Sequence, residues 1–146
     1  MTPDRIFELC NSLALPGWII LMFMPFWSNR DKFIVGIIIS LFAIIYTWLI
    51  FSSFDPSGFQ NFSSLDGVMS LFTNKTMVTA GWVHYLAFDL MTGVFIVQNA
   101  RLHGINHWLT VPCLFFTFML GPFGLLLYLL LRMVITRKYF AENYNH

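Results

Sequence analysis

Apolar residues in this chain are gathered into four long runs, each about as long as a lipid bilayer is thick. Residues 33–51 and 108–131 carry no charged side chain, while residues 6–27 and 77–100 carry one acidic residue each. A helix needs about 20 mostly apolar residues to cross the hydrocarbon layer. The pattern therefore predicts an all-α, polytopic membrane protein, a bundle of four transmembrane helices forming a single domain over residues 1–146.

Helix-breaking residues interrupt two of the four predicted spans. Pro122 lacks a backbone N–H, so we expect it to kink the fourth helix near Phe118 while the helix continues. Membranes tolerate such a kink when neighbouring groups satisfy the freed carbonyl. Pro16 and Gly17 interrupt the first span in the same way.

The only long connection, residues 52–75, contains a short amphipathic segment. Leu65, Val68, Met69 and Phe72 fall on one face of a helix over residues 64–72. We expect this helix to lie at the membrane surface or over the mouth of the bundle. The alternative is a loop that happens to contain several apolar residues.

Composition agrees with a membrane protein and excludes several other classes. Only 10% of the residues are charged and 58% are hydrophobic, whereas soluble domains carry about 25% charged residues. The net charge of +1 gives no reason to expect a nucleic-acid partner. Cys10 and Cys113 have no CxxC partner, so we interpret both as small buried apolar residues.

Lysine and arginine near the ends of the spans predict the orientation of the chain. With four spans, both termini and the long connection share one side, which holds five of these cations against three. The five are Arg5, Lys75, Arg132, Arg137 and Lys138, and the three are Arg30, Lys32 and Arg101. This count predicts an integral membrane protein with both termini cytoplasmic.

The third span is unusually polar, with Asp89 near its middle. A charged group at mid-membrane costs roughly 2.5–3.5 kcal/mol on insertion scales, so such residues usually face the bundle interior and serve a function. Steps of three and four residues define an interior stripe consisting of Trp82, Tyr85, Asp89, Thr92, Ile96, Asn99 and His103. For several of these residues, the alternative role is hydrogen bonding between helices.

His84 lies about 140° around the helix from Asp89, so the two can flank a pocket but do not stack on one face. Arg101 falls near the membrane interface, where snorkelling into lipid headgroups is the alternative to a role at the site. On the first span, Glu8 and Asn11 share a face. Glu8 either reaches the same pocket or stabilises the start of the helix, where the helix dipole favours a negative charge.

Metal binding and haem binding have weaker support. His84, Asp89 and Glu8 are suitable ligand types, but the chain has no HxxxH or ExxH pair. His84 and His103 lie on one helix, too far apart to hold the two faces of one haem. No cofactor is therefore predicted, and a metal at His84, Asp89 and Glu8 stays an alternative.

Three segments resemble a known family. They are residues 11–18, residues 81–90, which read Gly-Trp-Val-His-Tyr-Leu-Ala-Phe-Asp-Leu, and residues 121–126. Their order along the chain resembles that of the abscisic-acid-deficient-four family. Residues 64–72 also fit. Plant members of that family are needed to make neoxanthin, and bacteria carry short relatives. The chain has no plastid-targeting extension, so the resemblance implies a bacterial relative in the inner membrane.

The resemblance implies a four-helix membrane protein acting on or near a xanthophyll. The plant conversion opens an epoxide and creates an allene without net redox change. It needs a proton donor and a base, and Asp89 and His84 are the family-motif residues suited to these roles. Tyr85, Trp82, Asn99, Arg101, Asn11 and Glu8 are the expected supporting or substrate-binding residues.

Three hypotheses follow for the function. The first is an isomerase that acts on a carotenoid, retinoid or other isoprenoid within the bilayer. The second is a non-catalytic accessory protein that binds a pigment or lipid, either as a homo-oligomer or beside a partner membrane enzyme. The third is a metal-dependent membrane enzyme.

Overall fold

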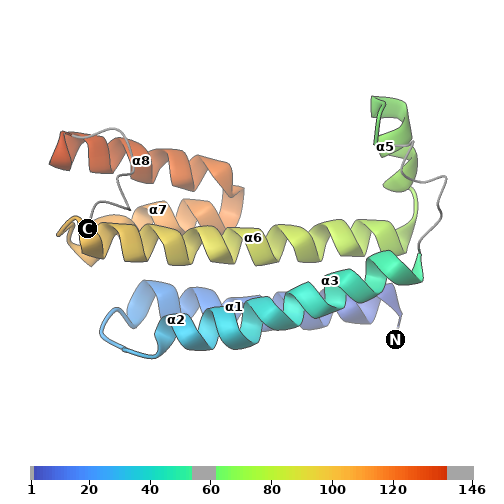
Figure 1. The fold of residues 1–146 in the computed structure, drawn as a ribbon, viewed down its shortest axis with the longest axis horizontal. Coiled ribbons are helices and arrows are strands. Elements are labelled where there is room, and N and C mark those ends of the chain that lie inside the picture. The colour runs from blue at the N-terminus through green and yellow to red at the C-terminus, as the bar shows by residue number, and fades with distance from the viewer. Residues whose placement is uncertain (1, 54–61, 138–146) are drawn as a thin grey trace.

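The computed structural model describes residues 2–53 and 62–137, and this part of the chain contains helices and no strand. Figure 1 shows the arrangement. The elements in chain order are α1 (Pro3–Phe23), α2 (Arg30–Phe33), the π-helical segment η1 (Ile34–Ile39), α3 (Ser40–Ser52), α5 (Leu65–Leu71), α6 (Lys75–Leu102), α7 (His107–Leu120) and α8 (Pro122–Thr136).

Three helices are long and apolar enough to cross a membrane, not four. They are α1, the continuous helix formed by α2, η1 and α3 over Arg30–Ser52, and α6. The all-α prediction and the first three predicted spans are therefore confirmed, with ends that differ by a few residues. The short helix predicted over residues 64–72 is also present as α5, which begins after Ser64 and lies at one end of the bundle (Figure 1).

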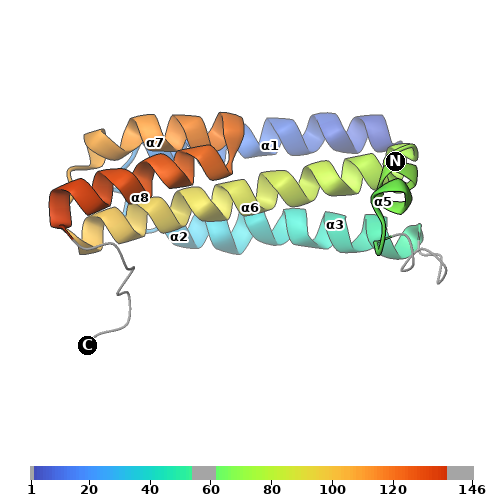
Figure 2. The same cartoon turned by 90° about the horizontal axis from the view of Figure 1, so that it is seen from above.

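The predicted fourth span is wrong, because residues 107–136 form two short helices. The chain reverses at Gly121, so that α7 and α8 run side by side in opposite directions (Figures 1 and 2). With 14 and 15 residues and a rise of 1.5 Å per residue, each helix is roughly 21–23 Å long, too short for a hydrocarbon layer about 30 Å thick. We call this pair the hairpin.

Two glycines permit the hairpin turn. Gly121 has a φ of +51°, a region that residues with a Cβ rarely adopt. A Cβ at Gly124 would collide with the backbone nitrogen of Thr117 and the carbonyl of Cys113. Pro122 starts α8 at a position where its missing N–H costs nothing. It therefore begins a new helix after the turn instead of kinking a continuous one.

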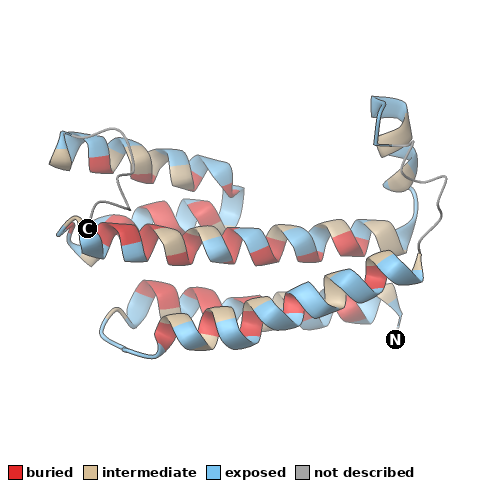
Figure 3. Cartoon of the chain, in the orientation of Figure 1, coloured by how far each residue is buried: buried red, intermediate tan, exposed pale blue. Residues whose placement is uncertain are grey.

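Helix α6 lies at the centre of the bundle and packs along α1 and α3 (Figure 2). Much of its surface is buried (Figure 3). Small residues bring α1 and α6 close together: a Cβ at Gly93 would lie 2.9 Å from atoms of Leu21 and Trp18, and one at Gly17 would lie 2.9 Å from Leu90. Such close approach is how helices associate in lipid, where the hydrophobic effect between them is absent.

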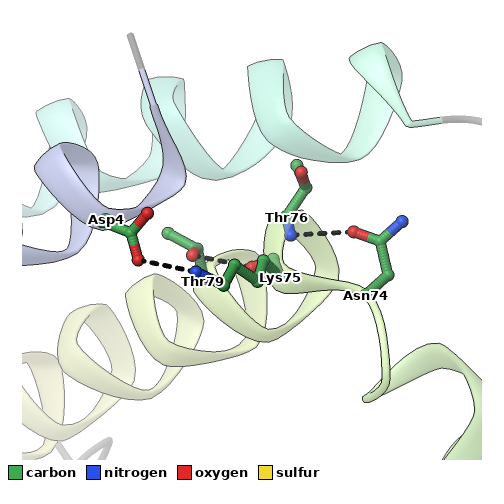
Figure 4. Close-up of polar contacts among 5 residues, drawn as sticks. All are labelled: Asp4, Asn74, Lys75, Thr76 and Thr79. Carbon is green, nitrogen blue, oxygen red and sulfur yellow. Dashed lines mark hydrogen bonds and ion pairs between the residues drawn. The ribbon is translucent and has the colours of Figure 1, made fainter.

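Polar side chains organise the start of α6 (Figure 4). The Asn74 side chain accepts a hydrogen bond from the backbone N–H of Thr76 at 2.8 Å, which caps the helix. Lys75 lies 3.3 Å from Asp4 of α1, and both side chains are exposed. An exposed pair of this kind contributes little to stability, but it shows that α1 and α6 start at the same end of the bundle.

The hairpin also removes the basis for the predicted orientation. The start of α1 lies at one end of the bundle, whereas α8 ends at the other, beside the end of α6 (Figures 1 and 2). The prediction that both termini share a side is therefore not supported. Among the described cations, Arg132 and Arg137 of this segment move to the side that holds Arg30, Lys32 and Arg101. Lys138 lies outside the described residues.

Candidate functional site

The polar stripe on α6 faces the bundle interior over most of its length. Asp89, Ile96 and Asn99 are buried, and Tyr85 and Thr92 are half-buried. The stripe faces α1 and the hairpin, both of which pack against α6. The interior-facing stripe expected from the sequence is therefore present from Tyr85 to Asn99, whereas Trp82, its first predicted residue, is exposed.

Asp89 lies where the turn of the hairpin meets α6. It is 9% exposed, and a Cβ placed on Gly121 would lie 2.8 Å from its Oδ1 atom. The Oδ2 atom is buried and has no hydrogen-bond partner among the described residues. Tyr85, one helical turn earlier, interacts with the Asp89 carboxyl group and places its hydroxyl 3.5 Å from the carbonyl oxygen of Met119. We call this contact the hairpin-tip junction.

Beyond the hairpin tip, the stripe continues against α1. The indole Nε1 of Trp82 donates a hydrogen bond to Asn11 Oδ1 at 2.8 Å. The Trp82 ring also lies 5.3 Å from that of Phe7 and 5.4 Å from that of Tyr85, measured between centroids. Asn11 and Trp82, both predicted as supporting residues, are thus brought together. Glu8 is exposed on α1, and the structure does not bring it into this cluster.

His84 lies on another face of α6, toward α3. It lines an apolar cavity of about 330 Å³ between the two helices, and its ring centroid lies 5.4 Å from that of Tyr46. Phe88 also packs against the imidazole, with centroids 4.5 Å apart and ring planes tilted by 32°. The remaining walls are apolar, formed by Ile39, Phe42, Ala43, Ala87 and Met91.

A second cavity of about 210 Å³ extends this space toward α5. Tyr46 and His84 line both cavities, so the two share a wall. Leu71 and Phe72, at the end of α5, and Phe62 also line it. We call the combined space the α3–α6 groove. Its lining is apolar apart from His84, which is exposed, and Tyr46, which is half-buried.

The structure therefore places the two predicted catalytic residues at different sites. His84 faces the α3–α6 groove, whereas Asp89 faces the hairpin tip. Their separation of about 140° around the helix follows from five residues of α-helical spacing. A single small reacting group cannot touch both side chains unless α6 rotates or unwinds.

Asn99, another predicted supporting residue, fixes the hairpin to α6. Its Oδ1 atom accepts hydrogen bonds from the Tyr128 hydroxyl at 2.6 Å and from Arg132 Nη1 at 3.1 Å. All three side chains are buried, with no more than 3% exposure. Buried polar side chains between helices need such partners, so this cluster is best understood as structural. Arg101 is exposed beside a separate cavity, near the end of α6.

The metal alternative receives no geometric support. In residues 2–53 and 62–137, no three His, Cys, Asp or Glu residues gather closely enough to hold an ion. Glu8 is exposed on α1, while His84 and Asp89 lie on different faces of α6. The cysteines Cys10 and Cys113 are both buried and free, as the sequence predicted.

Two important residues were missed by the sequence interpretation. Tyr46 lies in a span without charged residues, and nothing in the neighbouring sequence marks it as functional. The one available signal is that the hydroxyl of a tyrosine within a span needs a polar partner. Gly121 was not recognised as a turn, because the neighbouring Pro122 was interpreted as a kink in a continuous helix. The pair Gly121-Pro122 joins a residue that ends helices to one that begins them, and this signal could have identified the turn.

The fold and the site define a class of protein: a helical protein with three helices long and apolar enough to span a membrane, a hairpin of two shorter apolar helices, and polar residues turned inward on its central helix. The sequence profile of the ABA DEFICIENT 4-like family matches residues 5–128, so the chain belongs to this family. No curated protein and no solved structure matched the chain.

Proposed function

We propose that this protein isomerises a xanthophyll-like polyene by acid/base chemistry within the membrane. The observation that carries the proposal is the α3–α6 groove, where the exposed His84 and the half-buried Tyr46 supply titratable groups on an otherwise apolar surface. A polyene is long, narrow and apolar, which suits a groove between helices. Family membership supports this substrate class, because plant members of the family are needed to make neoxanthin.

In this proposal, His84 is the proton-transfer group. It removes a proton from a carbon of the bound end group while the C–O bond of an epoxide breaks. The oxygen takes up a proton from the Tyr46 hydroxyl, and the phenolate regains its proton from the His84 imidazolium. Atoms and electrons balance, because the product is an isomer of the substrate. Positioned acid/base groups of this kind accelerate reactions by about 10²–10⁴-fold.

Asp89 has a different place in the proposal. A ligand in the α3–α6 groove does not reach it, so Asp89 acts as the acid only if the end group binds at the hairpin-tip junction. There, Tyr85 and the unpartnered Oδ2 atom of Asp89 would meet the ligand. If the end group binds in the groove, His84→Gln loses activity and Asp89→Asn keeps it. If it binds at the hairpin-tip junction, the two variants behave the other way round.

The test uses the purified chain in lipid nanodiscs, supplied with an epoxy-xanthophyll and assayed by chromatography and mass spectrometry for a product of equal mass. We expect His84→Gln to lower turnover at least 100-fold, while bound pigment is retained. His103→Gln, the same change at the far end of α6, is the matched control and should stay within about twofold. Loss of activity in Asp89→Asn with normal activity in His84→Gln would move the reaction to the hairpin tip.

A second candidate is a non-catalytic accessory protein that binds a pigment or lipid. The separation of His84 and Asp89 on two faces of α6 favours it, because binding needs the groove but not a paired acid and base. In the same assay, an accessory protein retains the polyene and forms no isomer.

We further propose that the protein is a bacterial inner-membrane protein whose α1–α2 connection and α8 end face the cytoplasm. Five of the described lysine and arginine residues lie at that end, and Arg5 and Lys75 at the other. Such an excess marks the cytoplasmic side of membrane proteins.

A further inference from the structure

A cavity with both charged and apolar walls lies at the cation-rich end of the bundle, outside the α3–α6 groove and the hairpin-tip junction. Its volume is about 400 Å³, and Arg30, Arg101, His107 and Ser28 line it together with apolar residues. The α1–α2 connection, the end of α6 and the start of α7 form its walls. The cavity therefore opens where spanning helices end, close to the membrane surface.

Arg30 is the unusual residue of this cavity, because it is charged but only 3% exposed. Its Nε atom donates to Asp31 Oδ1 at 2.8 Å. The other carboxylate oxygen of Asp31 accepts a hydrogen bond from Gln98 Nε2 at 3.0 Å. Asp31 thus orients the guanidinium through its Nε edge. Among the described residues, the terminal nitrogens of Arg30 have no hydrogen-bond partner, so they can donate to a ligand.

The charges around the cavity favour an anion. Two arginines face a single carboxylate, Asp31, which already has partners on both oxygens. His107 is held in place by a 2.9 Å contact between its Nε2 atom and the carbonyl oxygen of Met22. Asp31 compensates the charge of the buried Arg30 guanidinium, so the exposed Arg101 leaves the cavity with an excess positive charge.

We propose that this cavity binds a phosphate anion, supplied by the headgroup of an anionic phospholipid. Arginine matches phosphate because its planar fork donates parallel hydrogen bonds to two oxygens. Basic pockets between spanning helices are recurrent sites for anionic lipid headgroups. The apolar part of the wall, formed by Phe26, Val97 and Ile105, suits the glycerol and the first carbons of the acyl chains.

The volume supports a ligand larger than a single ion. Small-molecule sites commonly measure about 300–1,000 Å³, and this cavity of about 400 Å³ falls within that range. A free phosphate would use only the arginine side of the cavity. A phospholipid headgroup would also use the apolar wall, so the two sources are distinguishable.

The test measures retention of phosphatidylglycerol and phosphatidylcholine by the full chain in detergent, using native mass spectrometry. The variants are Arg101→Gln, which changes an exposed side chain, and Arg30→Gln. Arg5→Gln, at the opposite end of the bundle, removes the same charge and is the matched control. Protection from thermal unfolding by inorganic phosphate is measured on the same four proteins.

We expect the wild type and Arg5→Gln to retain phosphatidylglycerol at least tenfold more tightly than phosphatidylcholine, and both cavity variants to lose this preference. If inorganic phosphate displaces the lipid and protects the protein from thermal unfolding only when Arg101 is present, the phosphate site is confirmed. Its ligand is then the free anion and not a lipid headgroup. Equal lipid retention by Arg5→Gln and Arg101→Gln, without arginine-dependent protection by phosphate, would overturn the proposal. Because Arg101→Gln leaves the buried Arg30–Asp31 pair intact, misfolding of Arg30→Gln would not obscure the result.

Discussion

Replacing Gly121 with alanine tests the contact that holds the hairpin tip against α6. The glycine has a φ of +51°, and an added Cβ would lie 2.8 Å and 3.2 Å from the two carboxylate oxygens of Asp89. Both the backbone conformation and the packing therefore oppose the substitution. We expect Gly121→Ala to destabilise the protein and to separate the tip from α6.

The expected magnitude has two parts. Holding a residue with a Cβ in a sparsely populated backbone region costs about 1–3 kcal/mol. The steric part adds to this cost, because the real Cβ contacts of proteins essentially never fall below 3.0 Å. In the double variant with Asp89→Ala, the steric part disappears and the backbone part stays, so the two substitutions should couple by about 1 kcal/mol or more.

The assay is unfolding by sodium dodecyl sulfate in mixed micelles, followed by circular dichroism. Gly36→Ala is the matched control, because Gly36 is exposed and no atom lies within 4 Å of its would-be Cβ. We expect this control to change the free energy of unfolding by no more than about 0.5 kcal/mol. If Gly121→Ala is as mild as the control, or if the double variant shows no coupling, the described contact between Gly121 and Asp89 is wrong.

Two further predictions concern the hairpin and the orientation. Tyr128→Phe removes the 2.6 Å hydrogen bond to Asn99. In the same assay, it should lower the free energy of unfolding by about 0.6–1.7 kcal/mol. An unchanged value would mean that this bond does not hold the hairpin. With three spans, Ser28→Cys and Ser64→Cys lie at opposite ends of the bundle, so an impermeant thiol reagent applied to intact cells should label only the Ser64→Cys variant. Labelling of both from outside would contradict the proposed topology.

The sequence predicted much of the fold because hydropathy and length determine where helices cross a membrane. Three spans, the short helix after Ser64 and the inward stripe on α6 were all expected and are present. The fourth span was wrong for a physical reason. Hydropathy measures how apolar a segment is, and a hairpin of two short apolar helices is as apolar as one helix that crosses the membrane.

The candidate site was predicted less completely. The stripe correctly placed Asp89 and Asn99 on the interior face of α6, because that face follows from helical periodicity alone. The spacing between His84 and Asp89 already indicated two faces, but it does not say which neighbour each face meets. That depends on long-range packing, which places Tyr46 beside one residue and the hairpin tip beside the other.

The π-helical segment η1 determines where the α3–α6 groove tolerates a change in chain length. Over Ile34–Ile39 the backbone accommodates roughly one more residue than a regular α-helix would, and the Ser40 hydroxyl bonds to the carbonyl of Val35, five residues earlier. Deleting one residue within η1 would only restore regular winding, because this segment already holds the extra residue. Deleting one residue from the regular part of α3 before Tyr46 would instead turn the rest of the helix by about 100°. Tyr46 would then leave the groove, so a single-codon deletion there changes the site more than the same deletion within η1.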